Sequence, residues 1–258
     1  MSAVAGQVGA LALRSVTRTL RQPASAIPPL IFPVMLMLVN AAGLDSSTRL
    51  PGFPTDSFLA FALAVPFIQG ALFSTMNAGT DLARDIQTGF LNRLALTPMR
   101  SGALLLGQLA GIVALALIQA TLYLTVGIAA GVRPESGVAG LFVVVLLAVL
   151  VAIAFGAIGA FLALRTGTGE AVQAMFPLLF VFLFLSSMNL PRNLIEIDWF
   201  RIVATINPVS YLIEGIRSLI VTGWDGQALA LGFGLALAIG AVALAAASLA
   251  LQGRLARS

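Results

Sequence analysis

The residue types that carry most enzyme chemistry are missing from this sequence. All 14 basic residues are arginine, and lysine, histidine and cysteine are absent. Without histidine or cysteine there is no zinc site of the usual kind, no serine–histidine pair and no disulfide framework. Without lysine there is no Walker A motif, whose lysine contacts the β- and γ-phosphates of a nucleotide. The sequence therefore predicts no catalytic site, no metal site and no cofactor on this chain, and it disfavours a membrane-embedded enzyme.

One short stretch, 80–97, combines charge with an apolar periodicity. Apolar residues recur there every four positions, at Leu82, Ile86, Phe90 and Leu94. This spacing is typical of one face of a helix. Thr80 or Asp81 is a suitable N-cap for a separate short helix, and Pro98 would end it. Such a helix is a candidate docking surface for another protein, and the alternative is a helix that lies on the membrane.

A second charged but apolar stretch covers 191–223. Asn207 is a suitable N-cap and Pro208 a suitable first helical residue, and Gly223 is a suitable end for the helix between them. A helix of about 15 residues is too short to span a bilayer. We therefore predict a re-entrant helical hairpin that dips into the outer leaflet, where backbone is tolerated if it is helical or buried in protein.

Glu214 and Arg217 carry the charge of this short helix. They are i, i+3 neighbours, so we predict that they pair along one helix face. Two interpretations stay open: an exposed ion pair that contributes little to stability, or part of an extracellular gate.

The composition identifies a polytopic membrane protein that must position these stretches. The chain has 258 residues, of which 59% are hydrophobic and only 9% charged, whereas a soluble domain carries about 25% charged residues. Six uncharged apolar stretches approach or exceed the ~20 residues of a spanning helix: 24–43, 58–78, 103–130, 138–164, 171–190 and 227–251. We therefore predict one all-α domain over 1–258 with six transmembrane helices.

Arginine counts set the predicted orientation. With the N-terminus inside, nine arginines fall in cytoplasmic segments and five outside, so the positive-inside rule places both termini in the cytoplasm. Arg14, Arg18 and Arg21 share one face of the segment 1–23. This pattern predicts an amphipathic helix in the cytoplasmic interface, and the alternative is a plain basic flank of the first span.

Neutral polar side chains are the candidates for a substrate pathway, because none of the six spans contains a charged residue. Gln69 and Asn77 lie in the second span, and Phe180 lies in the aromatic fifth span. We predict substrate contacts at these three residues. The alternative is packing, since neutral polar groups in membranes more often bond a neighbouring helix.

The stretch 80–100 resembles the coupling region of ABC-2 type exporter permeases, especially the daunorubicin-resistance drug-efflux branch. The matching residues are Asp85, Gly89, Phe90, Arg93, Leu94, Thr97, Pro98 and Arg100. The later stretch is similar to the last extracellular segment of that family at Asn207, Pro208, Tyr211, Glu214 and Arg217. Six spans, two cytoplasmic termini and a basic interfacial helix also match the family layout.

The resemblance implies a permease of the bacterial plasma membrane that works as a dimer with two separate cytoplasmic ATPase subunits, which would bind ATP and magnesium. It implies ATPase docking through Leu82, Asp85, Ile86, Gly89, Phe90, Arg93, Leu94 and Pro98. It also implies an extracellular gate at Asn207, Pro208, Tyr211, Glu214 and Arg217. The second permease subunit would be the same chain or a homologue, and nucleic acid is not an expected partner.

Two other transport functions remain alternatives. A permease of the same class that exports a polysaccharide or lipid would share the six-span layout. A secondary transporter that needs no ATPase is disfavoured, because such proteins usually carry ionisable groups within the membrane and the predicted spans have none.

Overall fold

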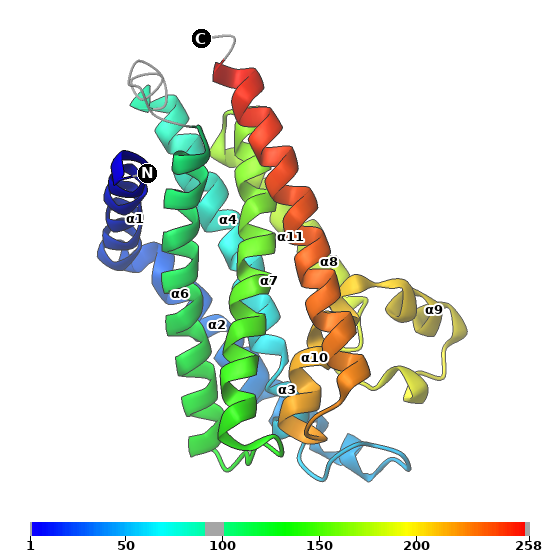
Figure 1. Cartoon of the computed structure of the whole chain (residues 1–258). Helices are drawn as coiled ribbons and strands as arrows, with labels where there is room; N and C mark the ends of the chain where they lie inside the picture. The colour runs from blue at the N-terminus through cyan, green and yellow to red at the C-terminus, as the bar shows by residue number, and fades with distance from the viewer. Residues whose placement is uncertain (1, 91–100, 256–258) are drawn as a thin grey trace.

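The computed structural model describes residues 2–90 and 101–255, and all regular secondary structure in these residues is helical (Figure 1). The longer helices are α1 Ser2–Arg21, α2 Pro23–Leu44, α4 Val65–Gln87, α6 Ser101–Ala129, α7 Gly137–Thr166, α8 Gly169–Phe184, α10 Pro208–Val221 and α11 Gly226–Leu255. The shorter ones are η1 Asp45–Arg49, α3 Phe58–Ala62, η2 Arg192–Leu194 and α9 Asp198–Ile206. The predicted all-α class is confirmed.

Within the described residues, five helical stretches are long and apolar enough to cross a membrane. They are Ile27–Arg49, Phe58–Gln87, Gly107–Ala129, Gly137–Thr166 and Gly226–Arg254. The predicted span 171–190 corresponds to α8, an apolar helix of 16 residues that ends at Phe184. At 1.5 Å per residue α8 is about 24 Å long, less than the ~30 Å of a bilayer core. Six spans therefore remain a prediction, whereas five long apolar helices are observed.

The predicted span 58–78 is divided near its start. α3 ends at Ala62, and α4 begins at Val65 with Pro66 in its first turn. A proline is tolerated there because the first turn of a helix has no intrahelical acceptor for its N–H groups. The division therefore starts a fresh helix and leaves carbonyl groups of α3 available for other partners.

α4 is the central helix of the bundle and is almost wholly buried. It approaches α7 so closely that a Cβ atom added at Gly159 would lie 1.9 Å from the carbonyl oxygen of Thr75. A Cβ added at Gly79 would lie 2.8 Å from the carbonyl oxygen of Gly159. The Thr75 hydroxyl donates across this contact to the carbonyl of Phe155, at 2.9 Å. Small residues and a threonine thus hold α4 against α7, as is common between membrane helices.

The bundle has two distinct ends (Figure 1). The start of α1, the last turn of α4 and the end of α11 lie toward one end, here called the terminal end. The α6–α7 and α10–α11 turns lie at the other, the far end, where the amides of Glu135 and Ser136 donate to carbonyls of α10 at 3.2 and 3.1 Å. Placement of both chain ends on one side agrees with the predicted topology, while the compartment that each end faces remains a prediction.

The predicted interfacial segment 1–23 forms the helix α1, which packs along α6. The contact is close at Leu11, since a Cβ added at Gly107 would lie 2.4 Å from the Cβ of Leu11. α1 is therefore held against the bundle by its apolar side, and a position in the membrane interface remains a prediction.

Candidate functional site

Aromatic rings from three helices form a continuous seam beside α4. The seam comprises Phe32 of α2, Phe73 of α4, and Phe176, Phe180 and Phe184 of α8. Its centre is Phe73, whose ring centroid lies 5.0 Å from that of Phe176 and 6.3 Å from that of Phe180. Its margins are exposed, with 44% of Phe32 and 52% of Phe184 accessible. The predicted pathway residue Phe180 is thus part of an aromatic surface that is only partly covered by this chain.

Gln69 precedes Phe73 by one helical turn, on the same face of α4. It is 1% exposed, and neither polar atom of its amide has a hydrogen-bond partner among the described residues. A buried amide without partners costs about 1–3 kcal/mol relative to a bonded one. Gln69 is therefore a buried amide without hydrogen-bond partners among the described residues, next to the aromatic seam, and its role in substrate contact stays a prediction.

Asn77 lies elsewhere, in a polar cavity of about 180 Å³ between α1, α4 and α6. The polar residues that line this cavity include Ser15, Gln22, Ser74, Asn77, Asp81 and Gln108. The three predicted pathway residues therefore do not form one site. Gln69 and Phe180 belong to the region of the aromatic seam, whereas Asn77 turns toward α1.

The predicted docking residue Asp85 is bonded within the chain. Its carboxylate accepts from both terminal nitrogens of Arg14, at 2.8 and 3.1 Å, and from Arg18 at 3.2 Å. Arg18 also pairs with Asp81 at 2.9 Å. The Asp85 side chain is only 4% exposed. We call these four residues, Arg14, Arg18, Asp81 and Asp85, the terminal ion-pair cluster, and it joins α1 to α4.

The predicted separate helix at 80–97 does not begin at Thr80 or Asp81, because α4 continues unbroken to Gln87. Gly79, just before these residues, lies within α4 and allows close approach to α7. α4 ends instead before Gly89, whose φ of +68° is the left-handed conformation common after a helix. The docking stretch is thus a direct extension of a central membrane helix.

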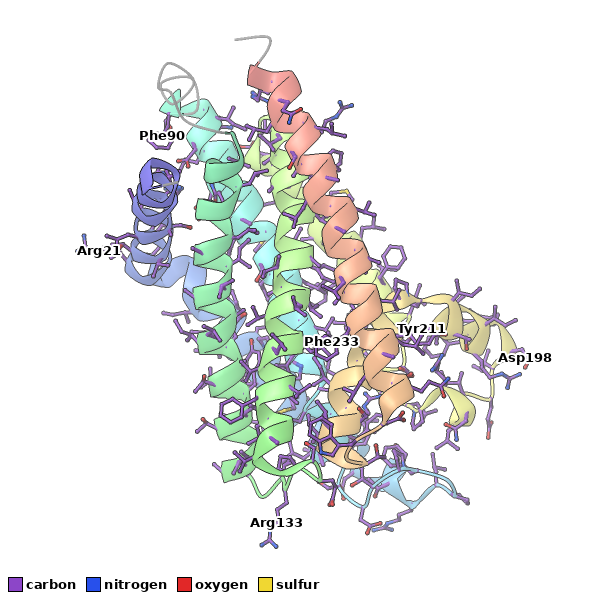
Figure 2. The ribbon with its side chains drawn as sticks, viewed as in Figure 1. Arg21, Phe90, Arg133, Asp198, Tyr211 and Phe233 are labelled. Carbon is purple, nitrogen blue, oxygen red and sulfur yellow. The ribbon has the colours of Figure 1, made fainter. Side chains whose placement is uncertain are left out.

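The other predicted docking residues are divided between the interior, the surface and the segment that is not described. Leu82 is fully buried in a cluster with Leu105, Ala163, Val172 and Leu251, and Ile86 packs against it. Leu82 and Asp85 are both buried within the chain, and the docking role expected of them stays a prediction. The Phe90 ring lies at the terminal end under the Arg14 guanidinium, 3.9 Å from its carbon (Figure 2). Arg93, Leu94 and Pro98 lie outside the described residues.

The predicted start and end of the helix in 191–223 are confirmed as α10. Asn207 caps it by accepting from the amide of Val209 at 2.9 Å, and Pro208 is the first helical residue. The Asn207 amide also donates to carbonyls near the end of α8, at 2.6 Å to Phe182. Gly223, at φ +88°, follows the end of α10. Asn207 therefore fixes α10 to the end of α8 as well as capping it.

The predicted hairpin has two unlike arms. α10 is buried in the far half of the bundle, with Leu212, Ile213 and Ile216 fully covered. α9 projects to the side and exposes apolar residues, including Trp199 at 61% (Figure 1). Tyr211 of α10, labelled in Figure 2 between the bundle and α9, donates from its hydroxyl to the carbonyl of Thr205 at 2.8 Å and so ties the two arms together.

Arg217 does not pair with Glu214, so the predicted ion pair is wrong. Its Nε donates to the Phe61 carbonyl at 3.0 Å, and its terminal nitrogens donate to the carbonyls of Ser187 and Met188, each at 2.9 Å. The guanidinium carbon also lies 3.5 Å from the centre of the Phe61 ring. These carbonyls come from a helix end and from the segment after α8, where intrahelical amide donors are lacking.

Glu214 pairs instead with Arg192, at 2.5 Å, and accepts from the Ser187 hydroxyl at 2.9 Å. The Arg192 guanidinium lies over the Tyr211 ring at 4.4 Å. An open cavity of about 500 Å³ at the far end is lined by Arg192, Glu214, Arg217 and Asp225, among others. We call Arg192, Glu214 and Arg217 the far-end cluster, and it fastens the segment 185–192 onto α10.

Comparison with known proteins identifies the family. The sequence model of the ABC-2 type transporter family matches residues 6–221, from α1 to the end of α10. The chain belongs to the ABC-2 type transporter family.

Two curated proteins are similar to the chain in sequence. A daunorubicin resistance ABC transporter permease protein, DrrB1 of Streptomyces coeruleorubidus, is 28% identical over 201 residues, 74% of this chain. The alignment covers 65% of that relative, slightly less than two thirds of its length. A protein described as a transport permease, ycf38 of Cyanophora paradoxa, is 25% identical over 203 residues, 77% of this chain and 69% of the relative. Together with the apolar helices, these similarities support a multi-pass membrane protein of this family.

The sequence analysis did not predict the partners of Asp85 in the terminal ion-pair cluster, nor those of Arg217 and Glu214 in the far-end cluster. Arg14 and Arg18 are spaced i, i+4, and so are Asp81 and Asp85. This matching spacing of opposite charges is a signal that could have predicted the terminal ion-pair cluster. The partners of Arg217 are backbone carbonyls, and the sequence contains no comparable signal for them.

Proposed function

We propose that this chain is the permease subunit of an ATP-driven ABC exporter that moves a hydrophobic or amphipathic substrate, drug-like or lipid-like, out of the cytoplasm or inner leaflet. The observation that carries the proposal is the family match over residues 6–221 in a sequence that has no lysine. Without a Walker A lysine, ATP and magnesium belong on a partner ATPase. Two ATPase copies and a second permease subunit, identical or homologous, complete the complex in a bacterial plasma membrane, with both termini cytoplasmic.

In this proposal the ATPase docks at the end of α4. Gln87 and Thr88 are exposed there, and Phe90 leads into the segment 91–100. α4 runs without a break from Val65 to Gln87, so a push at its end is transmitted along about 35 Å of helix. The same helix carries Gln69 and Phe73, which connects ATPase closure directly to the aromatic seam.

The aromatic seam is the proposed substrate route. Its exposed margins on α2 and α8 leave room for a second permease subunit to complete it, and aromatic faces suit apolar or cationic drug-like molecules. The Arg192–Glu214 pair of the far-end cluster would act as the outer gate, because both side chains line the far-end cavity and would have to separate for it to widen. A polysaccharide or lipid substrate remains the alternative, and transport assays distinguish the two.

The proposal is tested by reconstituting the permease with its ATPase in vesicles and following export of daunorubicin and of a fluorescent lipid. ATP-dependent export that is lost with an ATPase lacking its Walker A lysine is the expected result. Export of the same substrates by vesicles without any ATPase would instead identify a secondary transporter. If neither probe moves but a lipid-linked sugar does, the chain is a polysaccharide permease.

Docking at the end of α4 is tested separately with Phe90→Asp combined with Leu94→Asp. We expect loss of co-purification with the ATPase while the permease still folds. Val138→Asp is a matched control, because Val138 is an exposed apolar residue, 71% accessible, in α7 near the far end. Undiminished complex formation by the double variant would rule out docking at this site.

The substrate role of Gln69 is tested with Gln69→Leu, using Asn77→Leu as the comparison on the same helix. Loss of export in Gln69→Leu, with normal expression and ATPase binding, is expected from its place beside the aromatic seam. Unchanged export rates for every substrate would indicate that Gln69 serves helix packing and does not contact the substrate.

A further inference from the structure

A groove rich in arginine runs between α1 and α4 near the terminal end. It has a volume of about 700 Å³. Its charged lining consists of four arginines and one acid: Arg14, Arg18, Arg21, Arg84 and Asp85.

The four arginines are not equivalent. Arg14 and Arg18 are held by the carboxylates of Asp85 and Asp81 in the terminal ion-pair cluster. Arg21 and Arg84 are exposed, and among the described residues neither has a carboxylate within 4 Å. Within the described residues, two exposed guanidinium groups therefore line one groove without a carboxylate in ion-pair contact, next to two arginines that are paired.

The groove also has an apolar margin and continues into a membrane helix. Ala10 and Leu13 belong to its lining, and Leu13 is 69% exposed. Arg21 lies at the junction of α1 and α2, directed outward from the bundle (Figure 2), six positions before the apolar span that begins at Ile27. Cations next to exposed apolar side chains at the start of a membrane helix match the boundary between lipid headgroups and acyl chains.

We propose that this groove binds the phosphate headgroup of an anionic phospholipid, with Arg21 and Arg84 as its ligands and Leu13 beside the acyl chain. Guanidinium groups suit phosphate because their planar N–H groups donate in pairs to its oxygens. A headgroup held by α1 and α4 together strengthens the contact that the terminal ion-pair cluster already makes. The site is independent of the exported substrate, so failure of the export proposal would leave it standing.

The site is tested with the full-length chain in neutral detergent, titrated with phosphatidylglycerol or with phosphatidylcholine of the same acyl chains. The readout is the thermal unfolding midpoint, with bound lipids counted by native mass spectrometry. Phosphatidylglycerol is expected to raise the wild-type midpoint and phosphatidylcholine to have little effect. The double variant Arg21→Gln, Arg84→Gln is expected to need on the order of tenfold more phosphatidylglycerol, since each juxtamembrane arginine contributes to anionic-lipid affinity.

Two further variants separate this site from general charge effects. Arg133→Gln with Arg165→Gln removes the same charge from exposed positions outside the groove, and it is expected to respond like the wild type. Arg21→Lys with Arg84→Lys keeps the charge and is expected to recover most of the response. Both substituted arginines of the groove are exposed, so the variants are expected to fold.

Three outcomes would overturn the proposal. Equal stabilisation by phosphatidylcholine would show that the phosphate charge is not recognised. Equal stabilisation by glycerol phosphate at the same concentration would identify a site for a free phosphate and not for a lipid. Loss of ATPase binding in the glutamine double variant, with lipid binding unchanged, would assign the groove to the partner protein.

Discussion

The two ends of this permease bury charge in different ways. At the terminal end, Asp85 is neutralised by Arg14 and Arg18, so the partners are charged side chains on two helices. At the far end, Arg217 donates to three backbone carbonyls and lies over an aromatic ring, and its neighbour Glu214 pairs with a different residue, Arg192. The first cluster joins two helices that are regular throughout, whereas the second closes gaps where helices have ended.

This difference suggests different roles in movement. The terminal ion-pair cluster includes partly exposed side chains, with Arg14 at 42%, and ion pairs of this kind re-form easily after a small shift. Arg217 is 6% exposed, and releasing it would leave three carbonyls without donors, at a cost of about 1–3 kcal/mol each. We therefore expect α1 and α4 to adjust relative to each other, while Arg217 stays in place and any gate opens around it.

The largest effect is expected from exchanging the two charges of α10, in the variant Glu214→Arg, Arg217→Glu. A carboxylate at position 217 would face the carbonyls of Phe61, Ser187 and Met188, which repel it and offer it no donor. We expect no folded protein by size-exclusion chromatography in detergent. The control is the same exchange at Asp198 and Arg201, an exposed i, i+3 pair, which should be tolerated. Normal folding and export of the α10 variant would restore the simple pair predicted from the sequence.

A smaller but still large effect is expected from Arg217→Met. Methionine fills much of the space but leaves the three carbonyls unbonded, so the free energy of unfolding should fall by about 3 kcal/mol or more. Arg217→Lys should be intermediate, since an ammonium group keeps the charge but lacks the planar fork that reaches separate carbonyls. Thermal unfolding in detergent measures both. If Arg217→Met were as stable as the wild type, the carbonyl contacts would not hold the hairpin.

A moderate effect is expected from Asp85→Asn at the terminal end. The amide retains some hydrogen bonding, but Arg14 and Arg18 lose their shared charge, so unfolding should become easier by about 2 kcal/mol, less in high salt. Because α1 would loosen from α4, we also expect a lower rate of ATP-dependent transport, even under conditions where the variant remains fully folded. Measuring the free energy of unfolding of wild type and variant at two salt concentrations checks the predicted loss of stability and its salt dependence. A stability loss equal to that of Arg217→Met would remove the proposed contrast between the two ends.

The sequence predicted local features correctly and long-range contacts poorly. Asn207, Pro208 and Gly223 were placed correctly because caps and helix ends depend on local chemistry that each residue type carries. Arg217 was assigned the wrong partner because carbonyl acceptors are present at every residue, and only the fold decides which lack donors. Leu82 and Asp85 were assigned to a docking surface from the apolar periodicity and the family resemblance, yet α4 continues through both positions and α1 supplies the arginines that pair with Asp85. The sequence therefore indicated where helices form, but it did not indicate which distant residues contact Arg217 and Asp85.

The smallest effect is expected at Arg192 and Glu214. Both side chains are partly exposed, at 27% and 23%, so a double-mutant cycle with Arg192→Gln and Glu214→Gln should give a coupling of about 0.5–1 kcal/mol. A parallel cycle with Arg201→Gln and Glu214→Gln should give almost no coupling energy, because Arg201 pairs with Asp198 and not with Glu214. If Arg192–Glu214 is the part of the gate that opens, Glu214→Gln should also raise the rate of export while barely changing stability. If Glu214→Gln instead lowered both export and stability, Glu214 would have a structural role like that of Arg217 and would not be part of a moving gate.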